Sequence, residues 1–309
     1  SSNSYLFVSG YLNHPEIFEK AFPTALRPQG KEIVRTWLYY TLLKSTLLLD
    51  KPGFNHVWID GLGMDPWGRK MSKSLGNGID ADSVLECGAG GKTGSWKVKG
   101  PDKTVSLRAN KIGSECFRLW KACDAQVGDD FHINPEEIEK KYYGVLTKVF
   151  NVARFASMFP CPDDLDTTPA DLAIEDKWII AEFQSTMSIV EKSWHELDIY
   201  TATQALKSFA TGVLPSHWLE MVKSRLYDDD EAAAWTIHRI VRDFLSAFSP
   251  ICPFFSHHIS LTIYSKSAVD VDSFPVNIVD ELAVDMPQGD DLRKLTSSIQ
   301  EFNSSTWNG

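Results

Sequence analysis

Apolar residues recur at helical spacing through most of the second half of the chain. The first such stripe steps by three or four residues, and it consists of Ile138, Tyr142, Val145, Val149, Val152 and Ala156. A second stripe runs from Ile180 to Leu197, and shorter stripes end at Pro215 and before Pro250. Because the connections between these stretches are short, the pattern predicts an up-and-down bundle of helices over residues 134–265.

The first part of the chain has the mixed pattern of an α/β fold. Two β-prone runs, YLFVS at Tyr5–Ser9 and FNHVWID at Phe54–Asp60, flank a helical pattern that begins at Lys31. This order predicts a strand–helix–strand unit. In open α/β sheets, ligands bind beyond the carboxyl ends of the strands. The loop Gly61–Asn77, which follows the second run, is therefore the expected ligand site.

Two further segments differ in composition from their surroundings. The stretch 88–110 is rich in Gly and Lys, and its β-prone runs WKVK and TVSLRA are separated by Gly100-Pro101-Asp102. This pattern predicts a surface hairpin. Its lysines are able to touch an RNA backbone, but a solvated hairpin is the expected role. Residues 266–309 are acidic and irregular, and they are expected to form a linker and the start of a further segment.

The charges are distributed unevenly along the chain. The net charge is −10, yet residues 20–154 hold 21 Lys and Arg against 15 Asp and Glu, whereas residues 155–309 hold 10 against 24. We therefore expect any polyanion to meet the first half or its junction with the second.

Three observations bear on where the chain works. The longest apolar stretch, Thr36–Leu49, is interrupted by Lys44 and is shorter than the roughly 20 residues of a membrane span, so no membrane contact is expected. Nothing at the N-terminus resembles a secretion signal. The five cysteines contain no C-x-x-C pair, which predicts neither a disulfide framework nor a zinc ribbon. A reducing cytoplasm is the expected compartment.

The most specific motif of the chain lies in the expected ligand loop. Residues 70–74 read Lys-Met-Ser-Lys-Ser and are followed by Leu-Gly-Asn. Two lysines three positions apart, with hydroxyl side chains between and beside them, suit a loop that closes over a polyphosphate. Lys70 and Lys73 would then stabilise charge on a leaving pyrophosphate. The alternative is a loop that is merely solvated, which the exact motif disfavours.

This motif resembles the second signature of class I aminoacyl-tRNA synthetases. Further segments resemble motifs of valyl-tRNA synthetases of the archaeal kind, in the family's order. Leu26–Trp37 is similar to R-P-Q-G-x-(D/E)-I-x-R-T-W, and Gly113–Trp120 is similar to G-A-D-A-L-R-L-W. Asn151–Phe155 resembles W-N-A-x-R-F, and Ser249–Phe254 resembles H-P-F-M-P-F. The resemblance implies an α/β Rossmann-type half of a catalytic domain followed by a mostly α-helical anticodon-binding bundle.

The resemblance also implies roles for individual residues. Lys70 and Lys73 would be the catalytic residues. The residues implied for ATP binding are Gly30, Glu32, Gly61, Met71, Ser72 and Ser74. Ile33 and Trp37 match positions that line the amino-acid pocket, although ordinary helix core is an equal alternative on the residues alone. Asn151 and Arg154 are the implied tRNA contacts, and no metal-binding residue is implied.

The implied domains are a catalytic half over residues 1–133, the bundle over 134–265 and the acidic segment 266–309. The H-x-G-H signature of the class is absent, so the chain is expected to be a fragment that binds ATP and tRNA weakly and does not aminoacylate alone. The parent enzyme would use ATP and Mg²⁺ to join valine to tRNA(Val) through valyl-adenylate, with no obligate protein partner. An isoleucyl- or leucyl-tRNA synthetase fragment and a non-catalytic RNA-binding module are the alternatives.

Overall fold

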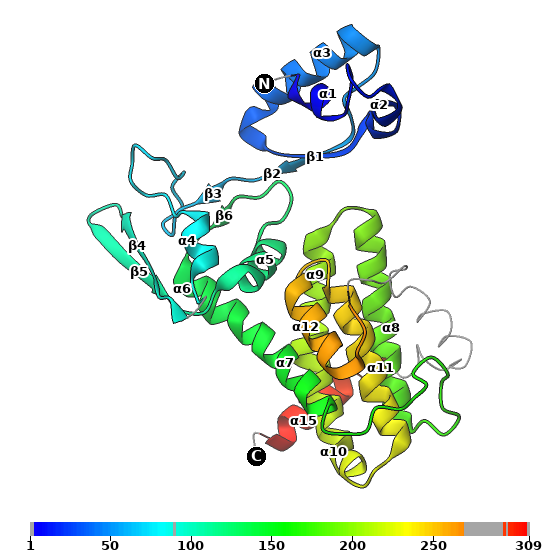
Figure 1. Cartoon of the computed structure of the whole chain (residues 1–309). Coiled ribbons are helices and arrows are strands. Elements are labelled where there is room, and N and C mark those ends of the chain that lie inside the picture. The colour runs from blue at the N-terminus through cyan, green and yellow to red at the C-terminus, as the bar shows by residue number, and fades with distance from the viewer. Residues whose placement is uncertain (1–2, 89–90, 269–292, 295, 308–309) are drawn as a thin grey trace. The chain divides into compact units, whose positions relative to one another are not determined.

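The computed structural model describes residues 3–88, 91–268, 293–294 and 296–307. Residues 89–90 of the expected hairpin and most of the expected acidic segment 266–309 therefore lie outside the described residues. The chain divides into two compact units (Figure 1). The loop unit comprises Ser1–Gly78, Lys99–Lys103 and Asp124–Ile133, and the helical unit comprises Ile79–Val98, Thr104–Cys123 and Asn134–Gly309.

The loop unit is built around one pair of parallel strands. Its elements are α1 (Ser4–Val8), α2 (Pro15–Ala21), β1 (Thr24–Gly30), a 3₁₀ turn η1 (Lys31–Ile33), a π-helical turn η2 (Val34–Leu38), α3 (Tyr39–Leu49), β2 (Phe54–Asp60), β3 (Gly63–Met64) and β6 (Phe131–His132). Strand β1 pairs with β2 in parallel from Thr24 and Phe54 to Gly30 and Asp60. The short strands β3 and β6 also pair in parallel.

The strand–helix–strand unit is present, but its first strand is not where the sequence predicts it. Residues Tyr5–Ser9 are helical in α1 and its C-cap, and the strand is β1, which contains Pro28. A five-residue apolar run does not distinguish a strand from a short helix. Here the Tyr5 ring packs against the rings of Phe22 and Phe54, at centroid distances of 6.5 and 5.6 Å, so tertiary contacts decide the outcome.

Helix α3 has an unusual distribution of side chains. Its buried residues are the polar Thr41 and Ser45, whereas Tyr39, Leu47 and Leu48 are exposed. The hydroxyl groups of Thr41 and Ser45 donate back to the carbonyls of Trp37 and Leu42, at 2.6 and 3.0 Å, and so are satisfied where they are buried. The small polar side chains allow the helix to approach the rest of the loop unit closely.

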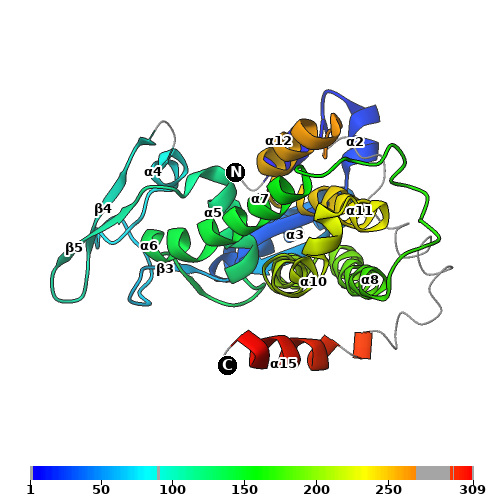
Figure 2. The same cartoon turned by 90° about the horizontal axis from the view of Figure 1, so that it is seen from below.

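The helical unit contains a bundle and, apart from the turn Lys99–Lys103, one hairpin. Its elements are α4 (Ala81–Glu86), β4 (Gly94–Lys99), β5 (Thr104–Ala109), α5 (Gly113–Asp124), α6 (Pro135–Ile138), a π-helical turn η4 (Glu139–Tyr143), α7 (Gly144–Ala156), α8 (Ile174–His195), α9 (Ile199–Ser208), a π-helical stretch η5 (Phe209–Trp218), α10 (Leu219–Tyr227), α11 (Glu231–Phe248), α12 (Pro253–Tyr264) and α15 (Thr296–Trp307). Helices α8 and α10 are seen nearly end-on in Figure 2. The predicted bundle is thus confirmed.

The predicted helices are interrupted by π-helical turns. The stripe that begins at Ile138 passes through η4 before it continues as α7, and the helix expected to stop at Pro215 instead continues through η5 into α10. Proline lacks the N–H that an α-helix uses at that position. The wider turns of η5 accommodate Pro215 without ending the helix.

Large aromatic side chains fill the interior of the bundle. Trp178, Trp218 and Trp235 are almost fully buried, as expected for core residues rather than base-stacking platforms. Among the residues that the structure describes, no helix combines the length and hydropathy needed to cross a membrane.

The predicted hairpin is formed by β4 and β5, which pair with each other. Its turn is closed by a hydrogen bond of 2.9 Å from Gly100 N to Lys103 O. Side chains alternate along β4, so that Trp96 is buried and Lys97 is exposed. The Trp96 indole N–H donates to Ser83 Oγ at 2.6 Å. One face of the hairpin is therefore packed, which corrects the expectation that it is merely solvated.

Candidate functional site

The candidate site is the loop Gly61–Asn77, which leaves the carboxyl end of β2 in the loop unit. Gly61 begins this loop in close contact with a neighbouring segment. A Cβ at this position would lie 1.7 Å from the carbonyl oxygen of Asp129. Asp130 Oδ1 accepts a hydrogen bond of 2.7 Å from Leu62 N, and it also forms an ion pair with Lys31 Nζ at 2.7 Å. Gly61 thus allows two backbone segments to meet where the loop starts.

Asp65 organises the first turn of the loop, and its side chain is fully buried. Its Oδ1 accepts hydrogen bonds from Trp67 N at 3.0 Å and Arg69 N at 2.9 Å. Its Oδ2 accepts from Arg69 Nε at 2.8 Å, forms an ion pair with Arg69 Nη2 at 2.7 Å, and accepts from Asn77 Nδ2 at 2.9 Å. Burial raises the pKa of Asp65, but these hydrogen bonds outweigh it and hold the pKa below its usual value.

Asn77 closes the loop from its other end. This buried side chain donates from Nδ2 to Asp65 and, at 3.2 Å, to the carbonyl of Lys70, while its Oδ1 accepts from Ser72 N at 2.9 Å. The amide therefore joins the two ends of the loop to the backbone of the Lys-Met-Ser-Lys-Ser segment. The side chains of Asp65 and Asn77 together form the buried brace of the loop.

The two lysines of the segment are in different electrostatic environments. Lys70 Nζ forms an ion pair with Glu32 Oε2, and both side chains are substantially exposed, at 62% and 42%. An exposed pair of this kind contributes about 0–1 kcal/mol and is easily exchanged for another anion. Lys73 is exposed and has no ion-pair partner among the described residues. Its ammonium group is thus available to a ligand.

The hydroxyl residues of the segment contact each other. Ser72 Oγ and Ser74 Oγ lie 2.7 Å apart, and Leu75 N donates to Ser72 Oγ at 3.3 Å. Met71 is half-buried, and its methyl carbon would lie 3.3 Å from a Cβ at Gly63. Met71 therefore packs against the start of the loop, while the serines line its outer side.

The other residues implied for this site lie at the end of β1 and just after it. Gly30 is the last residue of β1, and a Cβ there would meet only the Glu32 side chain, at 3.9 Å. Ile33 is half-buried, and Trp37 is 39% exposed. The Arg27 guanidinium lies 4.8 Å from the centroid of the Trp37 ring. Trp37 is therefore a surface residue of the loop unit rather than part of its core.

Asn151 and Arg154 belong to the helical unit. Both are exposed on α7, three positions apart on one face, opposite the buried Val152 and Ala153. This arrangement leaves both side chains accessible to a partner. Their contact with tRNA stays a prediction, as do the roles of the other implied site residues.

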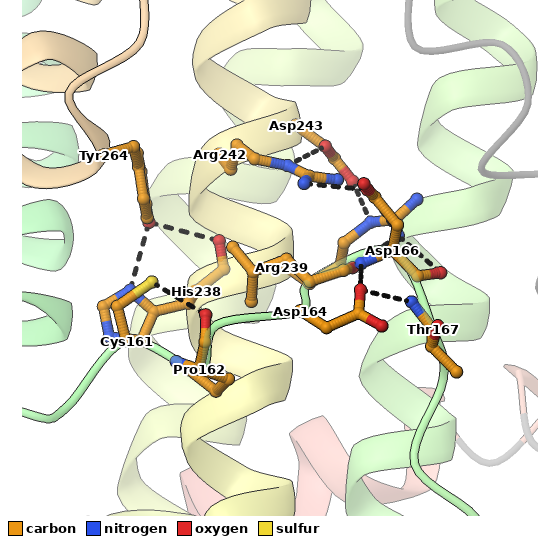
Figure 3. Close-up of polar contacts among 11 residues, drawn as sticks. Cys161, Pro162, Asp164, Asp166, Thr167, His238, Arg239, Arg242, Asp243 and Tyr264 are labelled. Atoms are coloured by element: carbon orange, nitrogen blue, oxygen red, sulfur yellow. Dashed lines mark hydrogen bonds and ion pairs between the residues drawn. The ribbon is translucent and has the colours of Figure 1, made fainter.

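A charge cluster on α11 is a structural feature rather than a second site (Figure 3). Arg239 and Arg242 both pair with the buried carboxylate of Asp243, and Arg242 Nη1 also lies 2.9 Å from Asp166 Oδ1. Arg239 Nη1 donates to the carbonyl of Leu165 at 2.7 Å. Because these groups satisfy one another, the cluster fastens the 164–167 segment onto α11.

Two family models match the chain. The model of class I tRNA synthetases (I, L, M and V) matches residues 2–134, and the model of the anticodon-binding domain of tRNA ligases matches residues 176–305. The chain belongs to the class I tRNA synthetases. Its Lys-Met-Ser-Lys-Ser loop lies within the part matched by the synthetase model. The part matched by the anticodon-binding model contains all but the first two residues of α8 and the whole of α9 to α12.

The relatives of this class I chain include archaeal valine–tRNA ligases. The chain is 35% identical to that of Aeropyrum pernix over 86% of its own length and 30% of the relative's. It is 30% identical to that of Pyrobaculum aerophilum over 99% of its own length and 35% of the relative's. The chain thus spans about a third of the curated relatives that it matches.

Solved structures share the fold. A methionyl-tRNA synthetase of Mycobacterium tuberculosis in complex with methionyl-adenylate superposes with a TM-score of 0.63 at 18% identity, over 84% of this chain and 48% of that one. A leucyl-tRNA synthetase of Agrobacterium radiobacter K84 superposes with a TM-score of 0.62 at 15% identity, over 88% and 31%. These neighbours confirm the predicted fold class.

Sequence reasoning found the lysines of the loop but not the side chains that hold them. Asp65 begins Asp-Pro-Trp-Gly, a typical turn sequence, and Asn77 follows the motif as an ordinary polar residue. The turn signal could have drawn attention to Asp65. That its carboxylate is buried and meets Asn77, twelve positions away, is visible only in the structure.

Proposed function

We propose that this chain is the part of a valyl-tRNA synthetase that holds the phosphates of ATP and binds the anticodon region of tRNA(Val). The observation that carries the proposal is the Lys-Met-Ser-Lys-Ser loop at the carboxyl end of β2, with Lys70 and Lys73 exposed above the buried brace of Asp65 and Asn77. The identity to archaeal valine–tRNA ligases supports valine as the amino acid. The whole protein would form valyl-adenylate from valine and ATP and then transfer the valyl group to tRNA(Val).

In this proposal, the lysines act on the leaving pyrophosphate. Lys73 is free to contact it directly, while Lys70 exchanges the Glu32 carboxylate for phosphate. Interactions that form only as negative charge develops accelerate the step, because they stabilise the transition state more than the bound substrate. Glu32, once released, is able to accept hydrogen bonds from ribose or adenine donors.

The remaining ATP contacts would come from the neighbouring backbone and hydroxyl groups. Gly30 leaves room at the end of β1, and Gly61 and Met71 would contact the nucleotide through their backbone groups. The Ser72 and Ser74 hydroxyls would donate to phosphate oxygens.

The remaining predictions concern substrates and location. Ile33 and Trp37 would contact the valine side chain, and Asn151 and Arg154 would contact tRNA. The proposed domains are the catalytic half over residues 1–133 and the bundle over residues 134–265. The proposed compartment is the cytoplasm.

Mg²⁺ is the proposed companion of ATP. Within the described part of the chain, no group of three His, Cys, Asp or Glu side chains is arranged to hold a metal ion. The proposal therefore places Mg²⁺ on the ATP phosphates and derives no step of this chain from it.

The first experiment tests the phosphate site on this chain. Calorimetric titration with inorganic pyrophosphate compares the unmodified chain with Lys73→Ala and with Lys51→Ala, an exposed lysine on the turn before β2. A charge-assisted contact contributes about 1.5–3 kcal/mol. We expect Lys73→Ala to weaken binding by roughly ten- to a hundredfold and Lys51→Ala to leave it unchanged. Equal affinities for the two variants would refute the role of the loop.

The second experiment tests the tRNA partner. Binding of this chain to valine, isoleucine and leucine tRNA transcripts is measured across a salt series, with an anticodon-mutated valine tRNA as control. We expect preference for the valine tRNA that is lost with the mutated anticodon. Equal and steeply salt-dependent binding to all transcripts would contradict specific recognition by the bundle.

A further inference from the structure

The turn of the β4–β5 hairpin touches the Lys-Met-Ser-Lys-Ser loop. Residues Lys99–Lys103 belong to the same compact unit as the loop, although they follow it by more than twenty positions. Lys99 N donates to the carbonyl of Gly76 at 3.1 Å. The Lys99 carbonyl in turn accepts a hydrogen bond from Arg69 Nη2. Both backbone groups of Lys99 are therefore bonded to the loop.

Side-chain packing accompanies these hydrogen bonds. Gly100 is buried, and a Cβ at this position would lie 3.2 Å from Trp67 Cζ2. The Trp67 ring also lies under the Arg69 guanidinium, 5.6 Å from its centroid. The absence of a side chain at Gly100 allows the hairpin turn to rest on the indole ring.

Both residues of the loop that the hairpin turn contacts are adjacent or hydrogen-bonded to one of the two lysines. Arg69 immediately precedes Lys70, and its guanidinium is fixed on the other side by the buried Asp65. Gly76 N donates to the carbonyl of Lys73 at 3.2 Å, so the residue that accepts from Lys99 is itself bonded to the second lysine. The hairpin thus holds the loop at a point just before Lys70 and at a point just after Lys73.

We propose that the turn Lys99–Lys103 of the β4–β5 hairpin, which lies in the loop unit, is a positioning element for the Lys-Met-Ser-Lys-Ser loop, with Lys99 and Gly100 as the positioning residues. They act through backbone contacts with Arg69, Gly76 and Trp67, and they restrict the loop to conformations in which both lysines face the same ligand. Only the identity of the ligand that the loop binds rests on the proposed function. The ordering of the loop itself is independent of any nucleotide.

The test measures the order of the loop by limited trypsin digestion of the whole chain. Cleavage after Lys70 and Lys73 requires local opening, and its rate follows the open population when opening is fast. Lys99→Pro removes the N–H that Gly76 accepts, whereas the matched variant Lys99→Ala removes the same charge and keeps the N–H. We expect cleavage after Lys70 and Lys73 to rise about tenfold in Lys99→Pro and to stay unchanged in Lys99→Ala.

Either of two results with the Lys99 variants overturns the proposal. If both variants cleave at the unmodified rate, the hairpin does not order the loop; if both rise equally, the charge of Lys99 and not its backbone is responsible. If Lys99→Pro also increases trypsin cleavage in the helical unit, the proline has disturbed more than the loop. In that case the variant Trp67→Ala tests the proposal. It removes the ring beneath Gly100, and we expect faster cleavage after Lys70 and Lys73 with unchanged cleavage elsewhere. An unchanged rate in that variant refutes the proposal.

A second readout separates this proposal from the proposed function. Inorganic pyrophosphate is added to each digestion, and it is expected to protect the loop of the unmodified chain and to protect that of Lys99→Pro less well. If the variants differ in cleavage while pyrophosphate protects neither, the hairpin orders the loop but the phosphate-binding function fails. A difference that appears only with pyrophosphate present would refute the positioning role.

Discussion

Replacing Asp65 with asparagine is expected to release the Lys-Met-Ser-Lys-Ser loop without unfolding the helical unit. The substitution preserves shape, and the carbonyl oxygen of the new side-chain amide is able to keep the bonds from Trp67 N and Arg69 N. Its amide nitrogen, however, would face three N–H donors, two from Arg69 and one from Asn77. A flipped amide would keep the Arg69 contact and lose the backbone bonds instead, so the variant is short of acceptors in either orientation.

The magnitude follows from the contacts that are lost. Charge-assisted hydrogen bonds contribute about 1.5–3 kcal/mol each, and two of them bind Arg69. The Arg69 side chain is 34% exposed, so water compensates part of the loss, and the lower end of the range applies. About 3 kcal/mol of lost loop stability corresponds to an increase on the order of a hundredfold in the open population.

Trypsin cleavage after Lys70 and Lys73 measures this increase, with Asp102→Asn in the exposed hairpin turn as the matched control. The reasoning is refuted if Asp65→Asn raises cleavage no more than the control does. The pH dependence gives a second check. Because the folded pKa of Asp65 lies below its unfolded value, its contribution is present above the unfolded pKa and is lost as the pH falls through the folded pKa. Hydrogen exchange of the loop amides should therefore lose protection in acid in the unmodified chain, and much less so in the variant.

Three further substitutions test the packing of the two units. Gly61→Ala would place a Cβ 1.7 Å from the Asp129 carbonyl oxygen and should cost about 3 kcal/mol, seen as a lower Tm, whereas Gly78→Ala, with open space around it, should be neutral. Arg225→Met removes the partner of the fully buried Asp176 carboxylate and should cost about 3 kcal/mol or more in urea unfolding, whereas Lys223→Met, in an exposed pair, should cost little. Burial lowers the pKa of His238, whose Nε2 lies 3.1 Å from the Phe159 carbonyl, so the stability it contributes is present above its unfolded pKa and is lost as the pH falls through its folded pKa. Tm should therefore fall less steeply below about pH 6.5 in His238→Asn than in the unmodified chain, and parallel pH profiles would contradict the assignment.

The helices of the bundle could be predicted because burial imposes a repeating pattern on their sequences. A helix such as α8 packs along its whole length, so its apolar residues recur at helical spacing. Strand β1 has no such signal. Strand β1 contains Pro28, a residue that is typical of loops. Among the described strands, only β2 pairs with β1. A proline is tolerated where no second neighbour needs its N–H.

The site was predictable only as far as its chemistry is local in sequence. Lys70 and Lys73 are recognisable because they belong to a five-residue motif that is continuous in the sequence. The buried brace and the hairpin contact join residues that are far apart, such as Arg69 and Lys99, and they use backbone groups that leave no mark in the sequence. Likewise, nothing in the sequence indicates that Glu32 pairs with Lys70.

This last pair alters how the loop responds to ionic strength. The attraction between an exposed lysine and a phosphate anion is screened by dissolved ions, so it weakens as salt is added. Lys70 already has a carboxylate in place of mobile ions, and added salt weakens that pair as well as the incoming one. The two screening effects oppose each other, so the proposed binding of phosphate by the loop should have the salt sensitivity of about one cation rather than two. The proposed affinity for phosphate should therefore change less with ion concentration than that of a loop with two unpaired lysines.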